Sequence, residues 1–266
     1  MDKKIIERHF GLLGARVKIG EVSRTWRSGG IDIRKDKIGE YFDIRVNTDE
    51  PVGYEVVDVK PDLRHLLLLA RTNEGKEKFL CGHDERHWFV CAVPGNGVSG
   101  VVKALEALQP ATVRGRIAQN LRRHKNRFER RNEAYVRQGE WFFVPAPELV
   151  VNPTFVNQIH KNEPLSRGRG SKPHLCEEIF RTGGELVWVS QRHRSGISQK
   201  RYAELIKTNP EAASWQWRTL VRNAIVFARG AVRHSDHKTI VLNGWHRVFM
   251  NTENEAPGMR HVVFLD

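Results

Sequence analysis

The chain has 266 residues, with 44 Lys and Arg against 31 Asp and Glu and a formal net charge of +13. A hydrophobic content of 39% excludes a mainly disordered chain. No apolar run approaches the ~20 residues of a membrane-spanning helix. The N-terminus lacks the features of a secretory signal, and three Cys are too few for a disulfide scaffold. We therefore expect a reduced, cytoplasmic protein with no membrane segment.

The first hundred residues are predicted to be rich in β-structure. Alternating or continuous apolar residues predict strands at 41–46, 54–59, 65–71, 78–81 and 88–93, joined as a meander. Ser99 is placed to cap a short helix that ends before Pro110.

A long basic amphipathic helix is predicted next. Val113, Ile117, Leu121, Phe128 and Tyr135 follow one another at spacings of four, four, seven and seven, which keeps them on one helical face. Five arginines would share a separate face, namely Arg116, Arg123, Arg127, Arg130 and Arg137. A short strand is expected at 140–145.

Residues 152–173 are predicted to form a basic Gly/Arg linker or loop between a β-rich part, 1–151, and an α+β part, 174–266. In the second part we expect hairpin turns at Gly183-Gly184 and Asn243-Gly244. A helix capped by Ser198 should end at Asn209-Pro210, and 261–265 should form a closing strand. The predicted fold class is α+β, mostly antiparallel meander and hairpins with the long basic helix and a few short helices.

Histidines and a lysine form the main catalytic candidates, which are His174, His237, Lys238 and His246. Metal-independent cleavage of RNA needs a base, an acid and a cation, which these residue types supply. A turn at Asn243-Gly244 would place His237 and His246 on one face, but about 13 Å apart unless the strand bends.

The metal patterns are weaker. Cys81, His83, His174 and Cys176 could in principle hold zinc, but their spacing matches no familiar arrangement, and we expect no metal and no cofactor. The nuclease-like pattern of Pro61-Asp62 with Glu74-Gly75-Lys76 spans a turn, which would displace its carboxylates from each other.

Charge and aromatic residues favour a nucleic-acid partner. Residues 112–137 carry nine Lys and Arg against two Glu, and residues 161–201 carry nine against four, so the excess charge is concentrated. Trp188, Trp215, Trp217 and Trp245 could either stack on bases or pack in the core.

The sequence thus predicts a nucleic-acid-binding protein, with RNA favoured over DNA and structured RNA as the partner. The expected contacts are the five arginines of the helix together with Arg167, Arg169 and Lys172. The alternatives are a metal-independent ribonuclease and a subunit that binds an acidic protein. The sequence does not indicate the oligomeric state.

Overall fold

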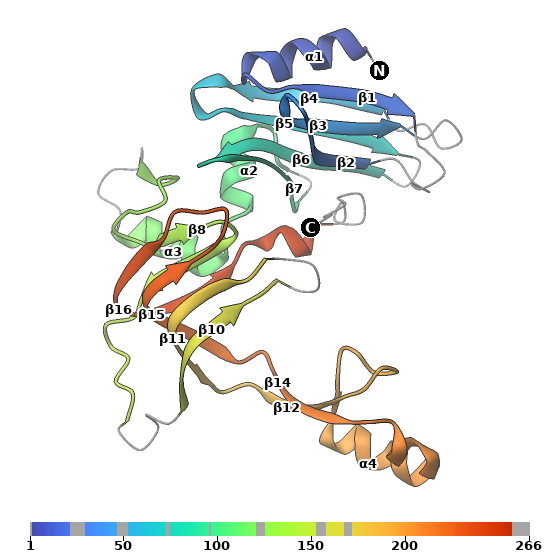
Figure 1. Ribbon diagram of the computed structural model, residues 1–266, viewed down its shortest axis with the longest axis vertical. Coiled ribbons are helices and arrows are strands. Elements are labelled where there is room, and N and C mark those ends of the chain that lie inside the picture. Colours follow the sequence, from blue (N-terminus) through green and yellow to red (C-terminus); the bar gives the residue numbers. More distant parts are fainter. Residues whose placement is uncertain are drawn as a thin grey trace.

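The computed structural model describes residues 2–21, 30–46, 53–72, 75–95, 97–120, 126–152, 158–167 and 172–256. The chain has a mixed α+β fold with mostly antiparallel sheets, as the sequence predicts. The N-terminal sheets lie at one end, a six-stranded sheet lies in the middle, and a small unit projects from the opposite end (Figure 1). Within the described ranges, no helix has the length and apolar character needed to cross a membrane.

The chain opens with helix α1 (Lys3–Leu12) and a three-stranded sheet of β1 (Val17–Glu21), β2 (Gly30–Asp36) and β3 (Gly39–Val46). Its strand order is β1-β3-β2. The Asp2 carboxylate begins α1 by accepting hydrogen bonds from the Lys4 and Ile5 amides. The helix buries Ile6 and Phe10, and the Phe10 ring lies 4.7 Å from that of Phe42 in β3.

A meander follows, which confirms four of the five strands predicted for it, whereas the predicted strand at 41–46 is β3 of the preceding sheet. It consists of β4 (Gly53–Lys60), the short 3₁₀ turn η1 (Pro61–Leu63), β5 (His65–Thr72), β6 (Gly75–Asp84) and β7 (His87–Ala92). Leu66 and Leu68 of β5 pack toward the N-terminal layer, whereas Leu67 packs toward helix α2 (Val101–Ala107). The continuous apolar run of β5 is therefore buried on both faces.

The start of α2 differs from the prediction. Its N-cap is Gly100 rather than Ser99. The Val101 amide donates instead to the Asp58 carboxylate of β4 at 2.8 Å, so a tertiary contact replaces the local cap.

Six strands form the central sheet: β8 (Val136–Gln138), β9 (Trp141–Pro145), β10 (Ile159–Leu165), β11 (His174–Thr182), β15 (Ile225–Arg233) and β16 (Ile240–Met250). Their order is β10-β11-β15-β16-β9-β8. Val136 from one edge strand and Leu165 from the other belong to the same core cluster, so the sheet curls until its edges share one interior. It takes strands from both sides of the expected linker, and β10 lies within residues 152–173.

The predicted long helix is wrong. Helix α3 covers only Ala111–Asn120, and Leu121 to Lys125 lie outside the described residues. Farther along, the Asn132 side chain accepts hydrogen bonds from the Ala134 and Tyr135 amides and forms a turn that leads into β8. Asparagine competes for backbone groups in this way, which ends helical geometry. Val113 and Ile117 do form the buried face of α3.

The Asn243-Gly244 hairpin is also wrong, because both residues lie inside β16. Gly244 has φ +80°, and the pairing with β15 shifts register between Ala228 and Gly230, which is a β-bulge. The turn between β15 and β16 is instead residues 234–239. The expected closing strand at 261–265 lies outside the described residues.

We call residues 185–222, which project beyond the central sheet, the arm (Figure 1). It contains β12 (Glu185–Val189), β13 (Ile197–Ser198), α4 (Gln199–Thr208), the 3₁₀ turn η4 (Pro210–Ser214) and β14 (Arg218–Arg222). Ser198 caps α4 as predicted, since its hydroxyl accepts from the Arg201 amide. Gly183-Gly184 does not form the predicted hairpin, because β11 and β12 belong to different sheets. The last described element, η5 (Thr252–Glu255), follows β16.

Candidate functional site

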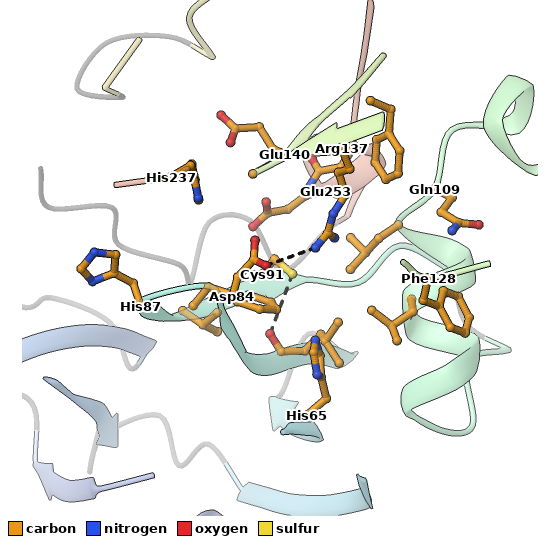
Figure 2. A pocket seen from close by; sticks show the side chains of 18 of the residues that line it. His65, Asp84, His87, Cys91, Gln109, Phe128, Arg137, Glu140, His237 and Glu253 are labelled. Carbon is orange, nitrogen blue, oxygen red and sulfur yellow. Dashed lines mark hydrogen bonds and ion pairs between the residues drawn. The ribbon is translucent and has the colours of Figure 1, made fainter. Parts of the chain in front are cut away.

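A cavity of about 350 Å³ lies between the meander and the central sheet. The meander contributes Asp84 and Cys91 to its wall, the β8–β9 turn contributes Glu140, and the β15–β16 turn contributes His237 (Figure 2). The cavity is therefore bordered by side chains from both halves of the chain.

Charged side chains around the cavity are mostly paired. Arg137 Nη2 lies 3.4 Å from Asp84 Oδ1 (Figure 2). Glu253 of η5 forms an ion pair with Arg167 at 2.9 Å, and its other oxygen accepts from the Ala92 amide at 3.2 Å. Burial raises the pKa of the Glu253 carboxyl, although the Arg167 guanidinium opposes the change. These ion pairs engage Arg137 and Arg167, two of the arginines that the sequence predicts to contact nucleic acid.

Three histidines gather beside the cavity, and we call them the histidine cluster: His174 at the start of β11, and His234 and His237 in the β15–β16 turn. One ring nitrogen of each can be chosen so that all three lie within 4.8 Å of one another. The ring centroids are 4.1 Å apart for His174 and His234, 4.7 Å for His234 and His237, and 5.6 Å for His174 and His237.

Gln138 of β8 orients His174. The Gln138 amide nitrogen donates to the carbonyl oxygens of Lys238 at 2.8 Å and Val232 at 3.3 Å, which fixes which way the amide points. Its oxygen therefore accepts from His174 Nδ1 at 2.9 Å. With the proton on Nδ1, the lone pair of His174 Nε2 is free, and that atom lies 3.6 Å from the Glu140 carboxylate.

Gly139 leaves space in front of the cluster. A Cβ at this position would lie 2.9 Å from His237 Nε2 and 3.4 Å from His174 Nε2. Both nitrogens therefore border the same point, which any larger residue would fill. Gly139 has φ +57°, a conformation that glycine adopts without strain.

Burial favours the uncharged imidazole at two members of the cluster, His234 and His237. Burial, together with the neighbouring His234 and His174, lowers the pKa of His237 to about 4. Burial and His174 also lower the pKa of His234.

No protein-family model, curated protein or solved structure matches this chain. Its function has to be argued from its own side chains.

The structure brings together two of the four predicted catalytic residues, His174 and His237. Lys238 is exposed and contacts Glu85 through its backbone amide. His246 lies in β16, where its Nδ1 is 3.0 Å from the Gly244 carbonyl, and it is not a member of the cluster. The sequence reasoning did not select His234, although the spacing His234-x-x-His237 was a signal for it.

The predicted nucleic-acid contacts are dispersed over several elements, and most are engaged with other residues. Arg116 donates to the Pro145 carbonyl at 3.1 Å. The partners of the others are Glu106 for Arg127, Asp84 and Glu85 for Arg130, Asp84 for Arg137, Glu253 for Arg167, and Asp236 for Lys172. Arg123 and Arg169 lie outside the described residues.

The sequence-based metal patterns are not assembled. Cys81 packs in the core of the N-terminal sheets and Cys176 in that of the central sheet, so they do not share a site. Asp62 lies in η1 and Lys76 in β6, both exposed, while Glu74 is outside the described residues.

The arm concentrates unpaired positive charge. It contains seven Lys and Arg and three Glu, a net charge of +4. Two of the seven pair with glutamates, Arg201 with Glu204 and Arg222 with Glu185. The other five are exposed and form no ion pair with a described acidic residue: Arg192, Arg194, Lys200, Lys207 and Arg218.

Aromatic rings stack along the same arm. Trp188 of β12 lies on Tyr202 of α4 with centroids 4.1 Å apart and planes 5° from parallel. His193 stacks with Trp217 at 5.5 Å and with Trp215 at 6.0 Å. All five rings are only partly buried. Trp245 instead lies in the central sheet.

Proposed function

We propose that this chain is a cytoplasmic nucleic-acid-binding protein that prefers RNA to DNA and binds it with the arm. The observation that carries the proposal is the coincidence, on one projecting unit, of five exposed cations that form no ion pair with a described acidic residue and five stacked, partly exposed rings. Stacking on aromatic side chains and attraction of phosphates are the two interactions that hold unpaired bases.

The contacts around Trp215 show how the arm combines a cation with stacked rings, as binding of unpaired bases requires. The Arg192 guanidinium lies 4.3 Å from the centre of the Trp215 ring, and Trp217 lies 6.2 Å away with its plane turned by 24°. The Trp217 indole is held by a 2.7 Å hydrogen bond to the Ala212 carbonyl. The rings are thus ordered before a ligand arrives, which reduces the entropy cost of binding.

RNA is favoured over DNA because its sequence-specific recognition uses single-stranded loops whose bases can stack on aromatic side chains. The projection of the arm leaves it accessible to a loop of a folded RNA (Figure 1). The partner we propose is therefore a structured RNA with an unpaired segment.

The ribonuclease alternative is less compatible with the cluster. A phosphate must lie between a base and an acid, whereas His174 and His237 are packed together with His234 so closely that one ring nitrogen of each lies within 4.8 Å of the others. Lys238 and His246 do not belong to the cluster.

The test measures binding of an RNA hairpin with an unpaired loop as salt is raised. Changing Arg192, Lys207 and Arg218 to Gln should reduce the slope of log affinity against log salt by about two, at ~0.7 for each phosphate that the variant no longer neutralises. Trp215→Ala should weaken binding by roughly 5- to 150-fold, the equivalent of ~1–3 kcal/mol of stacking.

The matched control removes the same charge from exposed positions of α1, by changing Lys3, Lys4 and Arg8 to Gln. This variant should keep the wild-type slope. Equal losses in both triple variants would mean that only the overall charge matters and would refute the proposal. A preparation that binds no RNA at low salt but binds an acidic protein through the arm would support the interaction-subunit alternative.

A further inference from the structure

The ring spacing of the histidine cluster matches that of a metal site, and the rings, which lie 22° to 28° from parallel, would have to turn for their in-plane lone pairs to meet at one ion. Three imidazoles around one tetrahedral ion at ~2.1 Å would place their ring centres about 5 Å apart. The observed separations are 4.1, 4.7 and 5.6 Å.

The hydrogen bonds of the cluster leave a lone pair free on His174 and engage the one on His234 Nδ1. His174 donates its Nδ1 proton to Gln138, which leaves Nε2 free. The Nδ1 lone pair of His234 accepts a 3.1 Å hydrogen bond from the Asp236 amide, which a metal ion at that atom would replace. His237 Nδ1 is buried without a hydrogen-bond partner. Metal-binding histidines commonly pass their second proton to an amide or a carbonyl in this manner.

The space that an ion needs is present and faces the cavity. The point above Gly139 is bordered by the Nε2 atoms of His174 and His237. Gly139, Glu140 and His237 also line the cavity, so one side of the cluster remains open to a small ligand (Figure 2).

We infer that His174, His234 and His237 bind one first-row divalent cation between their rings, on the side of the cluster that Gly139 leaves open, with Zn²⁺ as the ion that suits them best. Imidazole nitrogen is a preferred ligand of zinc, copper, iron and nickel. Three protein ligands and one open position form the pattern of a zinc site that is accessible to a further ligand. The Glu140 carboxylate, 3.6 Å from His174 Nε2, lies where it can contact a molecule in the open position.

The experiment measures zinc bound to the full chain after chelator treatment, reloading with Zn²⁺ and gel filtration. We expect about one zinc per chain in the wild type and about a tenth or less in His237→Ala. Gln138→Leu removes the acceptor for His174 Nδ1 and should weaken zinc binding by roughly 10- to 100-fold. Loading with Co²⁺ should give the visible absorption of a tetrahedral nitrogen site.

Two glycines supply a matched pair. Gly139→Ala places a methyl group 2.9 Å from His237 Nε2 and should abolish zinc binding. Gly183→Ala adds a methyl group at a similar backbone angle, φ +66° against +57°, but with no atom within 4 Å, and should keep the zinc. Far-ultraviolet circular dichroism shows whether each variant folds.

A reloaded wild type with less than about 0.1 zinc per chain overturns the inference, whatever the folding of the variants. Equal zinc retention by Gly139→Ala and Gly183→Ala, or by His237→Ala and the exposed-site control His160→Ala, also overturns it. None of these outcomes depends on whether the arm binds RNA.

Discussion

Glu253 joins the two halves of the molecule, and its removal should be the most damaging single change at the cavity. Its side chain is 2% exposed, and it contacts the Ala92 amide of β7 and the Arg167 guanidinium that follows β10. Glu253→Ala would leave both groups without this partner in a buried setting. Loss of one member of a buried ion pair costs about 3 to 5 kcal/mol.

The assay is urea unfolding followed by tryptophan fluorescence, with a double-mutant cycle. Glu253→Leu and Arg167→Leu should each destabilise the protein, whereas the double change should recover part of the loss because no buried charge is left alone. We expect a coupling of roughly 1 to 3 kcal/mol. Glu255→Ala, at an exposed position of the same 3₁₀ turn, is the control and should change stability by no more than about 0.5 kcal/mol.

Additive effects of Glu253→Leu and Arg167→Leu, within about 0.3 kcal/mol, would refute the reasoning. So would a Glu253→Ala protein as stable as the Glu255→Ala control.

Three further predictions concern Glu253, Asn132 and the histidine cluster. The pKa of Glu253 is raised above its ordinary value of 4.5, so folding favours its protonated form. The stability of wild type relative to Glu253→Gln should therefore fall as the pH rises above 4.5, and a rise would contradict this. Asn132→Ala removes the acceptor for the Ala134 and Tyr135 amides and should lower the free energy of unfolding in urea by about 1 to 3 kcal/mol. A loss below roughly 0.5 kcal/mol would contradict this prediction. Zinc at 100 times its dissociation constant should add about 2.7 kcal/mol and raise the melting temperature by roughly 5 to 11 °C, with no shift in His237→Ala.

Local patterns predicted the elements whose stability is local. The meander strands follow from alternating or continuous apolar residues, and α4 follows from the Ser198 cap. The prediction of a long helix is wrong because Phe128 and Tyr135, although spaced as on one helical face, pack in different places. Phe128 lines the cavity, and Tyr135 packs in the cluster with α3 and β9. Spacing alone does not separate these cases.

The candidate metal site was only partly visible in the sequence. His174 and His237 were selected for their chemistry, but the roles of Gln138 and Gly139 depend on the curl that brings β8 back toward β11 and β15. Likewise, Asn243-Gly244 has the composition of a hairpin turn, yet β15 and β16 pair on both sides of it and convert it into a bulge. Such long-range pairing cannot be derived from local residue patterns.

The curl of the central sheet also means that β9 is synthesised well before its pairing partner β16. Strand β9 is apolar on both faces, and its pairing with β16 joins Pro145 to His246, about a hundred residues later in the chain. At roughly 5 to 20 residues per second, a ribosome needs about 5 to 20 s to supply that partner. During this interval Trp141 to Val144 remain a strand with an open edge, and a nascent chain stalled before β16 presents an aggregation-prone segment to chaperones.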